Sequence, residues 1–303
     1  MSHRLIFQRI GSAITSASAI AIVVHADSSG DEAYGRALSK LPSPSSRTTA
    51  VPSSHTTATK SNSKVVAATS VQQKLISPAD AMSRWPNLYV IPQTRAVAGL
   101  FTTLRDVDSA QGAFVNAADR LMRILAEEGL AALPGSQEIV VQTPVGTYNG
   151  LQVAAPHKIS AVSIVRAGDS LLEAAHAVCP SLSSGKILIQ RDEEDAEKRP
   201  RLFYVKLPNS IASRAGVLLV DPMLATGQSA GLAIRELLSR GVLEENIVFL
   251  NVVACPEGLD ALFAAHPKIK VVTGAVDSHL NSSKYIVPGL GDFGDRYFGT
   301  TQH

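Results

Sequence analysis

Residues 220–229, Val-Asp-Pro-Met-Leu-Ala-Thr-Gly-Gln-Ser, carry the groups that a phosphate and a sugar require. The apolar run 217–220 predicts a strand, which places Asp221 at its carboxyl end, where ligands bind in open α/β sheets. A helix predicted to begin near Ser229 offers free N–H groups to an anion. Thr226 and Ser229 add hydroxyls, and Gly227 allows close approach of the backbone. This segment therefore predicts an anion site.

The chemistry of Asp221 narrows the ligand of this site. Its carboxylate can accept hydrogen bonds from two neighbouring ribose hydroxyls, so the segment suits a ribose 5-phosphate. It matches neither the GxxxxGK[ST] loop of nucleotide hydrolases nor the GxGxxG turn of dinucleotide-binding domains. An ordinary strand exit followed by a hydroxyl-capped helix is the structural alternative.

Two arginines are candidates for binding further anionic groups. Arg166 follows an apolar run, 159–165, and precedes Gly168, a position from which a guanidinium can hold a diphosphate with two hydrogen bonds. A structural carboxylate could pair with it instead. Arg191 precedes the acidic residues 192–195 and, by its own context, has the character of a surface salt-bridge residue.

The C-terminal residues 284–300 combine glycines with large apolar side chains. The glycines exclude a regular helix, while the side chains allow packing: Tyr285, Ile286, Phe293, Tyr297 and Phe298. A tight glycine-bearing loop can present backbone donors and acceptors to a bound ligand. Just upstream, Asp277 and His279 could be interpreted as an acid–base pair, but a solvated turn is predicted for them.

The positions of these residues follow from an alternation of strands and helices. Helices are predicted over 114–130, 170–178 and 229–239, with Gly241 as a C-terminal cap. Strands are predicted over 138–143, 159–165, 186–190, 217–220 and 247–253 and around Val271. Short β-branched runs alternating with helices indicate an α/β fold, a parallel sheet flanked by helices on both faces.

Composition excludes several classes of protein. The 303 residues are 45% hydrophobic and 18% charged, as in a globular chain. A net charge of +2 without a dense basic run predicts no nucleic-acid partner. Cys179 and Cys255 form no CxxC pair, which favours a reduced intracellular compartment, with the cytoplasm as the default. Cys255 is predicted to be a buried, inert thiol.

Residues 1–80 differ in composition from the rest. Arg4 and Arg9 precede a Ser- and Ala-containing apolar stretch without acidic residues, typical of an organelle presequence, so a mitochondrion or plastid is the alternative location. Residues 43–62 are mostly Ser, Thr, Pro and Ala, which predicts a disordered linker. An untargeted extension fits equally. Residues 81–303 are the predicted globular domain, which is not expected to enter a membrane.

Four segments together resemble one family. Residues 220–229 are similar to the ribose-phosphate motif of type I phosphoribosyltransferases, in the Asp-Pro-Met-Leu-Ala-Thr-Gly form of uracil phosphoribosyltransferases. Residues 162–170 resemble the family's diphosphate-binding turn, 185–195 its next strand and flexible loop, and 284–300 its uracil signature. The match runs in order from about 88 to 301. Phe293 and Tyr297 are typical of eukaryotic members.

The resemblance implies transfer of 5-phosphoribosyl from 5-phospho-α-D-ribose 1-diphosphate to uracil, giving UMP and diphosphate. It implies catalytic roles for Arg166, Arg191 and Asp221. These three would also bind the donor, together with Pro222, Met223, Leu224, Ala225, Thr226, Gly227, Gln228, Ser229 and Asp292. Uracil contacts would come from a small C-terminal base-binding hood that contains Ile286, Gly291, Asp292 and Phe293.

The resemblance also implies partners. Mg²⁺ is the expected cofactor, bound mainly through the donor diphosphate and not by a protein metal site. GTP is a candidate activator, and a homodimer or homotetramer is expected. One position supports an alternative, a catalytically silent nucleotide-binding or regulatory homologue: Gln228 stands where the family usually has glycine, and would strain the loop if that position needs a positive φ.

Overall fold

The computed structural model describes residues 75–191 and 200–300. The N-terminal presequence and linker predictions, and the acidic loop after Arg191, lie outside these residues. The first described residues already join the domain: Ile76 pairs with Val276, and Ser77 caps the first helix, α1 (Pro78–Arg84), by accepting a hydrogen bond from Asp80 N.

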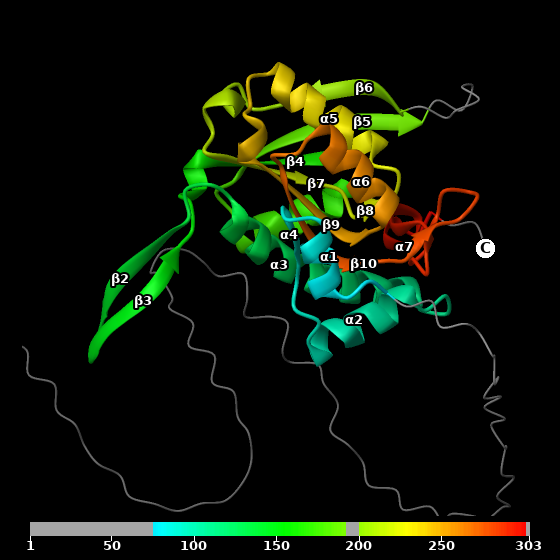
Figure 1. The fold of residues 1–303 in the computed structure, drawn as a ribbon, viewed down its shortest axis with the longest axis horizontal. Coiled ribbons are helices and arrows are strands. Elements are labelled where there is room, and N and C mark those ends of the chain that lie inside the picture. The colour runs from blue at the N-terminus through cyan, green and yellow to red at the C-terminus, as the bar shows by residue number, and fades with distance from the viewer. Residues whose placement is uncertain (1–74, 192–199, 301–303) are drawn as a thin grey trace, which may run out of the picture. The chain divides into compact units, whose positions relative to one another are not determined.

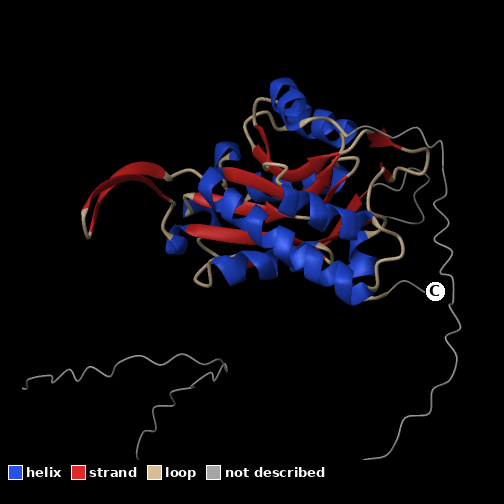
Figure 2. Cartoon of the chain, turned by 90° about the horizontal axis from the view of Figure 1, so that it is seen from below, coloured by secondary structure: helices blue, strands red, loops and turns tan. Residues whose placement is uncertain are grey.

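One twisted sheet forms the centre of the domain (Figures 1 and 2). Its strand order is β1-β10-β9-β7-β4-β5-β6, and β8 also pairs with β9. All pairings are parallel except that of β5 with β6. The strands are β1 (Leu88–Val90), β4 (Ile159–Val165), β5 (Ser183–Arg191), β6 (Pro200–Lys206), β7 (Gly216–Val220), β8 (Met223–Leu224), β9 (Ile247–Ala254) and β10 (Lys270–Val276).

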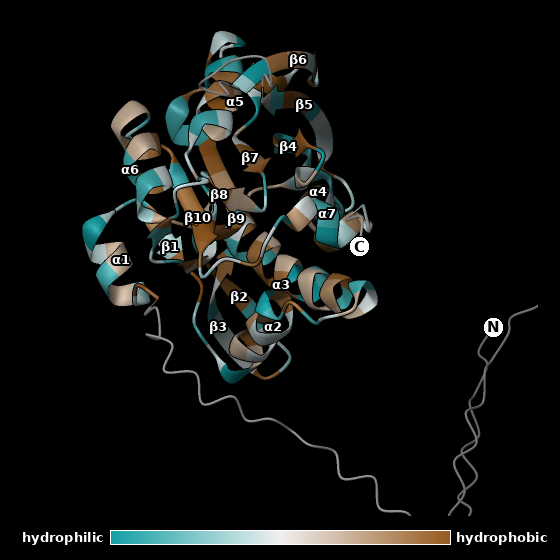
Figure 3. Cartoon of the chain, turned by 90° about the vertical axis from the view of Figure 1, so that its right-hand side faces the viewer, coloured by the Kyte–Doolittle hydropathy of each residue, from teal (hydrophilic) through white to brown (hydrophobic). Residues whose placement is uncertain are grey.

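Helices cover both faces of this sheet. One apolar cluster joins it to α2 (Arg95–Arg105), α3 (Gln111–Ala132) and α4 (Gly168–Val178). A second cluster joins the other face to α1, α5 (Gln228–Ser239) and α6 (Pro256–Ala265). All residues of β7 and β9 are buried because both of their faces are covered. Figure 3 shows these strands as a hydrophobic interior beneath helices with hydrophilic outer faces.

The predicted parallel α/β sheet is therefore confirmed, and so are its predicted central strands. The predicted helices lie within α3, α4 and α5, and Gly241 follows α5 with φ +85°, as expected of a C-terminal cap. The short helices α2 and α6 and the antiparallel strand β6 were not predicted. Among the described helices, none is both long and apolar enough to cross a membrane.

The strand predicted over 138–143 forms outside the sheet. It is β2 (Gln137–Thr143), which pairs antiparallel with β3 (Gly146–Gln152) in a two-stranded hairpin that projects from the domain (Figure 1). Nearly all of its residues are exposed. Its polar ends cannot be buried on two faces as the central strands are, which explains its exclusion from the core.

The remaining short elements belong to the C-terminal part. Strand β11 (His279–Leu280) pairs antiparallel with β12 (Ile286–Val287), and helix α7 (Phe293–Phe298) ends the described chain. These elements stand beside the carboxyl ends of the central strands (Figure 1). The predicted C-terminal hood therefore has a structural counterpart. The prediction that its glycines exclude a helix was wrong: α7 forms because Gly294 is the only glycine within it, while Gly291 precedes it and Gly299 caps its end.

Candidate active site

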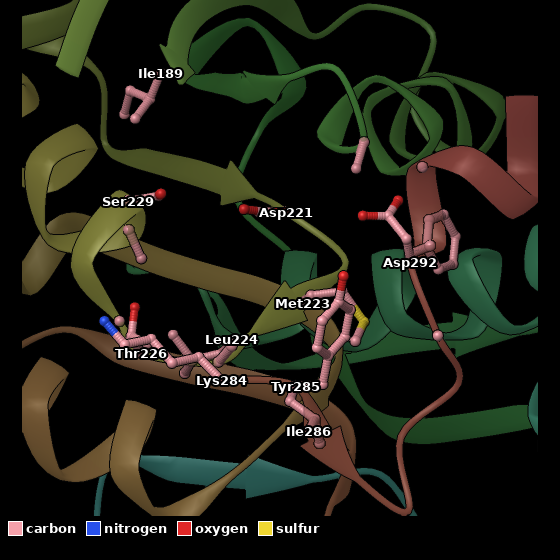
Figure 4. A pocket seen from close by; sticks show the side chains of 17 residues that line it. Ile189, Asp221, Met223, Leu224, Thr226, Ser229, Lys284, Tyr285, Ile286 and Asp292 are labelled. Atoms are coloured by element: carbon pink, nitrogen blue, oxygen red, sulfur yellow. The ribbon is translucent and has the colours of Figure 1, made fainter. Parts of the chain in front are cut away.

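A cavity of about 410 Å³ opens at the carboxyl ends of the central strands (Figure 4). It joins two segments, the phosphate loop (residues 221–229) and the base segment (residues 284–300). Its lining contains eleven of the predicted site residues: Asp221, Met223, Leu224, Ala225, Thr226, Gly227, Ser229, Ile286, Gly291, Asp292 and Phe293. It also contains Ala167, Ile189, Ala230, Lys284, Tyr285 and Gly294, which were not predicted.

The phosphate loop is held from behind by the start of α6. Gly227 has φ +75°, and a Cβ there would lie 2.9 Å from the carbonyl oxygen of Gly258. A Cβ on Gly258 would in turn lie 2.4 Å from the carbonyl oxygen of Ala225, so both positions require glycine. The Cys255 thiol donates to that same carbonyl at 3.1 Å. Burial raises the pKa of this thiol to about 12, as expected of an inert cysteine.

Gln228 lies in ordinary helical backbone. It is the first residue of α5, and among the described residues Lys284 alone has a positive φ without being glycine. Its side chain is exposed and lines a neighbouring groove shared with Thr226 and Arg235. The loop strain that motivated the silent alternative is therefore absent.

Asp221 and Asp292 face the cavity from opposite sides (Figure 4). Burial raises the pKa of Asp221 to about 7, against a hydrogen bond from the Met223 backbone that lowers it, and the charge of Asp292 adds to the rise. Asp292 caps α7 by accepting from Asp295 N at 2.8 Å. A carboxyl that gains or loses its proton near neutrality thus stands where the ribose hydroxyls were expected.

Pro222 does not line the cavity. It is buried, and its carbonyl accepts from the N–H groups of Val252 and Val253 at 2.8 and 3.1 Å. These bonds fix the exit of β7 against β9. Pro222 thus fixes the backbone of the loop.

Arg166 stands beside the cavity, at the turn before α4. A Cβ at the nearby Gly168 would lie 2.4 Å from the carbonyl oxygen of Val220, so glycine is needed for this turn to pass β7. The guanidinium pairs with Asp295 at 2.6 Å and with the hydroxyl of Thr300 at 3.0 Å. The Thr300 hydroxyl and this arginine lower the pKa of Asp295.

The ion pair of Arg166 is half-exposed, with 49% of its side chain accessible. Surface pairs of this kind contribute only about 0–1 kcal/mol, so a better anion could displace Asp295. Arg191 ends β5, two residues beyond Ile189 of the cavity wall. The structure describes its backbone alone.

An ion pair organises the entry to the base segment. Asp277 is fully buried, and its two carboxylate oxygens accept from Arg105 at 2.7 and 2.8 Å. The pair also binds Gly289 on both sides: the Gly289 N–H donates to Asp277 at 2.8 Å, and its carbonyl accepts from Arg105 at 2.8 Å. The prediction of a solvated turn at Asp277 was wrong, because this residue is buried and paired. The sequence did not indicate the pairing, since Arg105 is 172 residues away.

Helix α7 is anchored to α3 and to the end of α2. Arg296 donates to the carbonyls of Leu104 and Leu290 at 2.6 and 2.7 Å, and Tyr297 donates to Asp119 at 2.7 Å. The ring of Phe293 stacks on Tyr297 at 5.6 Å. The hood residues are thus positioned by helices far away in sequence.

Among the placements that sequence reasoning did not predict are those of Lys284 and Tyr285 in the cavity wall and of Arg105 beside Gly289. Lys284 and Tyr285 belong to the segment that carried the uracil resemblance, but no pattern indicated that they face the cavity. Arg105 stands at the end of an amphipathic helix, where a basic residue ordinarily complements the helix dipole. Its buried partner could not be identified from the sequence.

Comparison with known proteins agrees with this arrangement. The family model described as uracil phosphoribosyltransferase matches residues 90–300. The chain belongs to the uracil phosphoribosyltransferase family. The uracil phosphoribosyltransferase of Dictyostelium discoideum is 51% identical over 220 residues, covering 72% of this chain and 99% of its own. That of Saccharomyces cerevisiae is 47% identical over 212 residues, covering 70% and 96%.

A solved structure extends this family likeness to three dimensions. The AQ2163 protein of Aquifex aeolicus superposes with a TM-score of 0.58 at 30% identity, covering 71% of this chain and all of that one. The matched region of the uracil phosphoribosyltransferase family contains the phosphate loop, Arg166 and all of the base segment.

Proposed function

We propose that this chain transfers 5-phosphoribosyl from 5-phospho-α-D-ribose 1-diphosphate to uracil, giving UMP and diphosphate. The observation that carries the proposal is the single cavity that joins the phosphate loop to the base segment. A sugar phosphate on the loop and a pyrimidine under the base segment would share that cavity, so the anomeric carbon and the base nitrogen could meet.

The phosphate loop supplies positioning. The free N–H groups at the start of α5, with the hydroxyls of Thr226 and Ser229, bind the 5-phosphate. Asp221 accepts hydrogen bonds from the ribose hydroxyls in its ionised form. The donor's C–O bond to diphosphate breaks through an oxocarbenium-like state. The ring nitrogen of uracil forms the new bond to carbon and loses its proton to the departing diphosphate.

The arginines act on the leaving group. In this proposal Arg166 exchanges Asp295 for the diphosphate, and Arg191 contributes a second guanidinium. Neutralising the departing charge in a site that excludes water favours transfer over hydrolysis. The role of Arg166 rests on its weak surface pair at the cavity edge.

Uracil selection is assigned to the backbone of the base segment. Ile286, Gly291 and Phe293 line the cavity, and the ion pair at Gly289 fixes the loop between them. A backbone N–H facing O4 of uracil would meet the amino group of cytosine, leaving a buried donor unpaired. That mismatch excludes cytosine.

Mg²⁺ is the proposed cofactor. The described residues contain no cluster of three or more metal-binding side chains. The two facing carboxylates, Asp221 and Asp292, fit a cation that takes most of its oxygen ligands from a diphosphate and water. When bound, Mg²⁺ would neutralise diphosphate charge, while the protein residues orient the sugar and the base.

A turnover assay tests this function. Purified protein with radiolabelled uracil, the donor and Mg²⁺ should form UMP and diphosphate in equal amounts, and EDTA should abolish the reaction. Cytosine, adenine and hypoxanthine in place of uracil should give no nucleotide. Donor binding without UMP under any condition would support the silent alternative instead.

We also propose that the chain forms a homodimer or homotetramer. The β2–β3 hairpin exposes 68% of Val140, 62% of Tyr148 and 57% of Leu151. Monomeric proteins rarely leave several large apolar side chains together on a projecting ribbon, so a second copy is the expected cover. Light scattering of the wild type and of a Val140→Asp, Leu151→Asp double variant would show whether these residues hold the assembly together.

Other aspects of the proposal concern regulation and location. We propose residues 81–303 as the catalytic domain and 1–80 as an extension, cleaved if the chain enters a mitochondrion or plastid and retained if it stays in the cytoplasm. Mass spectrometry of the mature N-terminus separates these outcomes. GTP is proposed as an activator without an assigned site, and initial rates with and without GTP test it.

A further inference from the structure

We propose that Lys284 binds the 5-phosphate of the sugar donor and thereby holds the base segment to the phosphate loop. The inference rests on the proposed function and adds a residue to its phosphate site. Lys284 lines the cavity together with Thr226, Gly227 and Ser229. Figure 4 shows its side chain extending along the cavity toward Thr226, away from the hood from which it originates.

The backbone at Lys284 is held in an uncommon conformation that presents the side chain to the cavity. Its φ is +64°, which is rare for a residue with a Cβ. Asn281 maintains this turn: its side-chain oxygen accepts from Ser283 N at 3.0 Å and from Tyr285 N at 2.9 Å. Its carbonyl accepts from Lys284 N at 2.9 Å, and its own N–H donates to the carbonyl of Tyr285 at 2.9 Å. Four hydrogen bonds thus fix the turn that carries Lys284.

The charges around the cavity indicate which ligand group Lys284 would bind. Asp221 and Asp292 are acidic, and Lys284 is the single basic side chain on the described cavity wall. A phosphate group with a charge near −2 meets N–H groups, hydroxyls and the partial charge of a helix on the phosphate loop, but no full positive charge. An ammonium directed to Thr226 supplies that charge and strengthens the hydrogen bonds to the phosphate.

The location of Lys284 connects the two halves of the site. It is separated by one residue from Ile286, which is buried in the cavity wall of the base segment. A phosphate that binds Lys284 therefore holds the start of the base segment against the phosphate loop. Uracil then meets a wall already in place, so a bound donor should lower the apparent KM for uracil.

Calorimetric titration with ribose 5-phosphate tests the inference on the full-length protein. Lys284→Met, which keeps the length and removes the charge, should weaken binding of ribose 5-phosphate about tenfold or more. Lys284→Arg should retain binding within about threefold, because it keeps the charge. Lys268→Met is the matched control, since Lys268 is exposed and lies outside the cavity lining.

Kinetics separate a phosphate contact from a general loss of structure. For Lys284→Met, the KM for the donor should rise about tenfold, and the KM for uracil should rise at low donor concentration and recover at saturating donor. An unchanged melting temperature would verify the fold. If wild type and Lys284→Met bind ribose 5-phosphate equally, this inference is overturned although the proposed function stands. If the wild type makes no UMP, the proposed function itself fails.

Discussion

The phosphate loop and the base segment reach the same cavity by different physical means. The loop is fixed by its neighbours in the fold core: strand β7 ends at it, α5 begins in it, and Gly258 and Cys255 of the next strand and helix pack against it. The base segment has little regular structure. It is held by hydrogen bonds to α2 and α3, nearly 200 residues earlier in the chain, and by the Arg105–Asp277 ion pair that binds Gly289. In this one site, the phosphate loop is therefore positioned by adjoining elements of the core, and the base segment by contacts with residues distant in sequence.

This difference gives the two regions different vulnerabilities. The loop should fail through backbone changes, because glycine conformations and close contacts define it. The base segment should fail when a distant charge is removed, because no local structure replaces it. Substitutions in each region should consequently affect different substrates.

The largest effect is expected from Asp277→Ala. It leaves Arg105 without its buried partner and frees the Gly289 N–H, which should lower the free energy of unfolding by about 3 kcal/mol. Uracil turnover should fall at least a hundredfold, since about 3 kcal/mol separates an ordered from a disordered loop. Denaturant melts and initial rates measure the two losses.

Ribose 5-phosphate binding serves as the control for Asp277→Ala. The phosphate loop makes no contact with this ion pair, so calorimetric binding of the sugar phosphate should stay near the wild-type value. Equal loss of sugar-phosphate and uracil binding would show that the two regions are one cooperative unit and end the comparison.

Gly227→Ala should damage the loop selectively. The positive φ and the 2.9 Å approach to the Gly258 carbonyl should together cost about 2 kcal/mol, or roughly a thirtyfold rise in the KM for the donor. Gly112→Ala is a matched control, because a Cβ there meets open space. A donor KM close to that of the wild type would contradict this prediction, because the loop would then tolerate a side chain at this position.

The pH dependence should report on Asp221. Because the pKa of this carboxyl is about 7 and its role requires the ionised form, kcat/KM for the donor should fall about tenfold for each pH unit well below 7 and level off above it. Mg²⁺ favours the carboxylate, so the profile of kcat should shift to lower pH. An Asp221→Asn variant should have a low rate without this acidic limb; an unchanged limb would assign it to another group.

Gln228→Gly should have the smallest effect. The residue is exposed at the start of α5 and adopts a helical conformation, so restoring the family's usual glycine should change donor KM less than threefold and cost at most about 1 kcal/mol in stability. A large gain in activity would revive the view that this loop is impaired. Parallel kinetics of both proteins decide the point.

The sequence alone determined the parallel sheet, the phosphate loop and the place of the base segment. The apolar run 217–220 predicts a strand, and the glycine beside Thr226 predicts a tight turn. Both are local features of the chain, so periodicity and spacing are enough to detect them. The family resemblance added the uracil-binding segment, because a motif can be matched before its fold is known. Most predicted cavity residues indeed line one cavity.

Only the tertiary structure decided which distant side chains meet. Neither Arg105 nor Asp277 belongs to a recognisable motif. Their direct pairing, and the bonds of both to Gly289, require the end of α2 to lie next to the end of β10. The raised pKa of Asp221 depends on burial by surrounding elements and on Asp292, neither visible in the loop's own residues. Lys284 faces the phosphate loop through the turn around Asn281. Contacts between remote segments come from packing, which residue types and spacing do not encode locally.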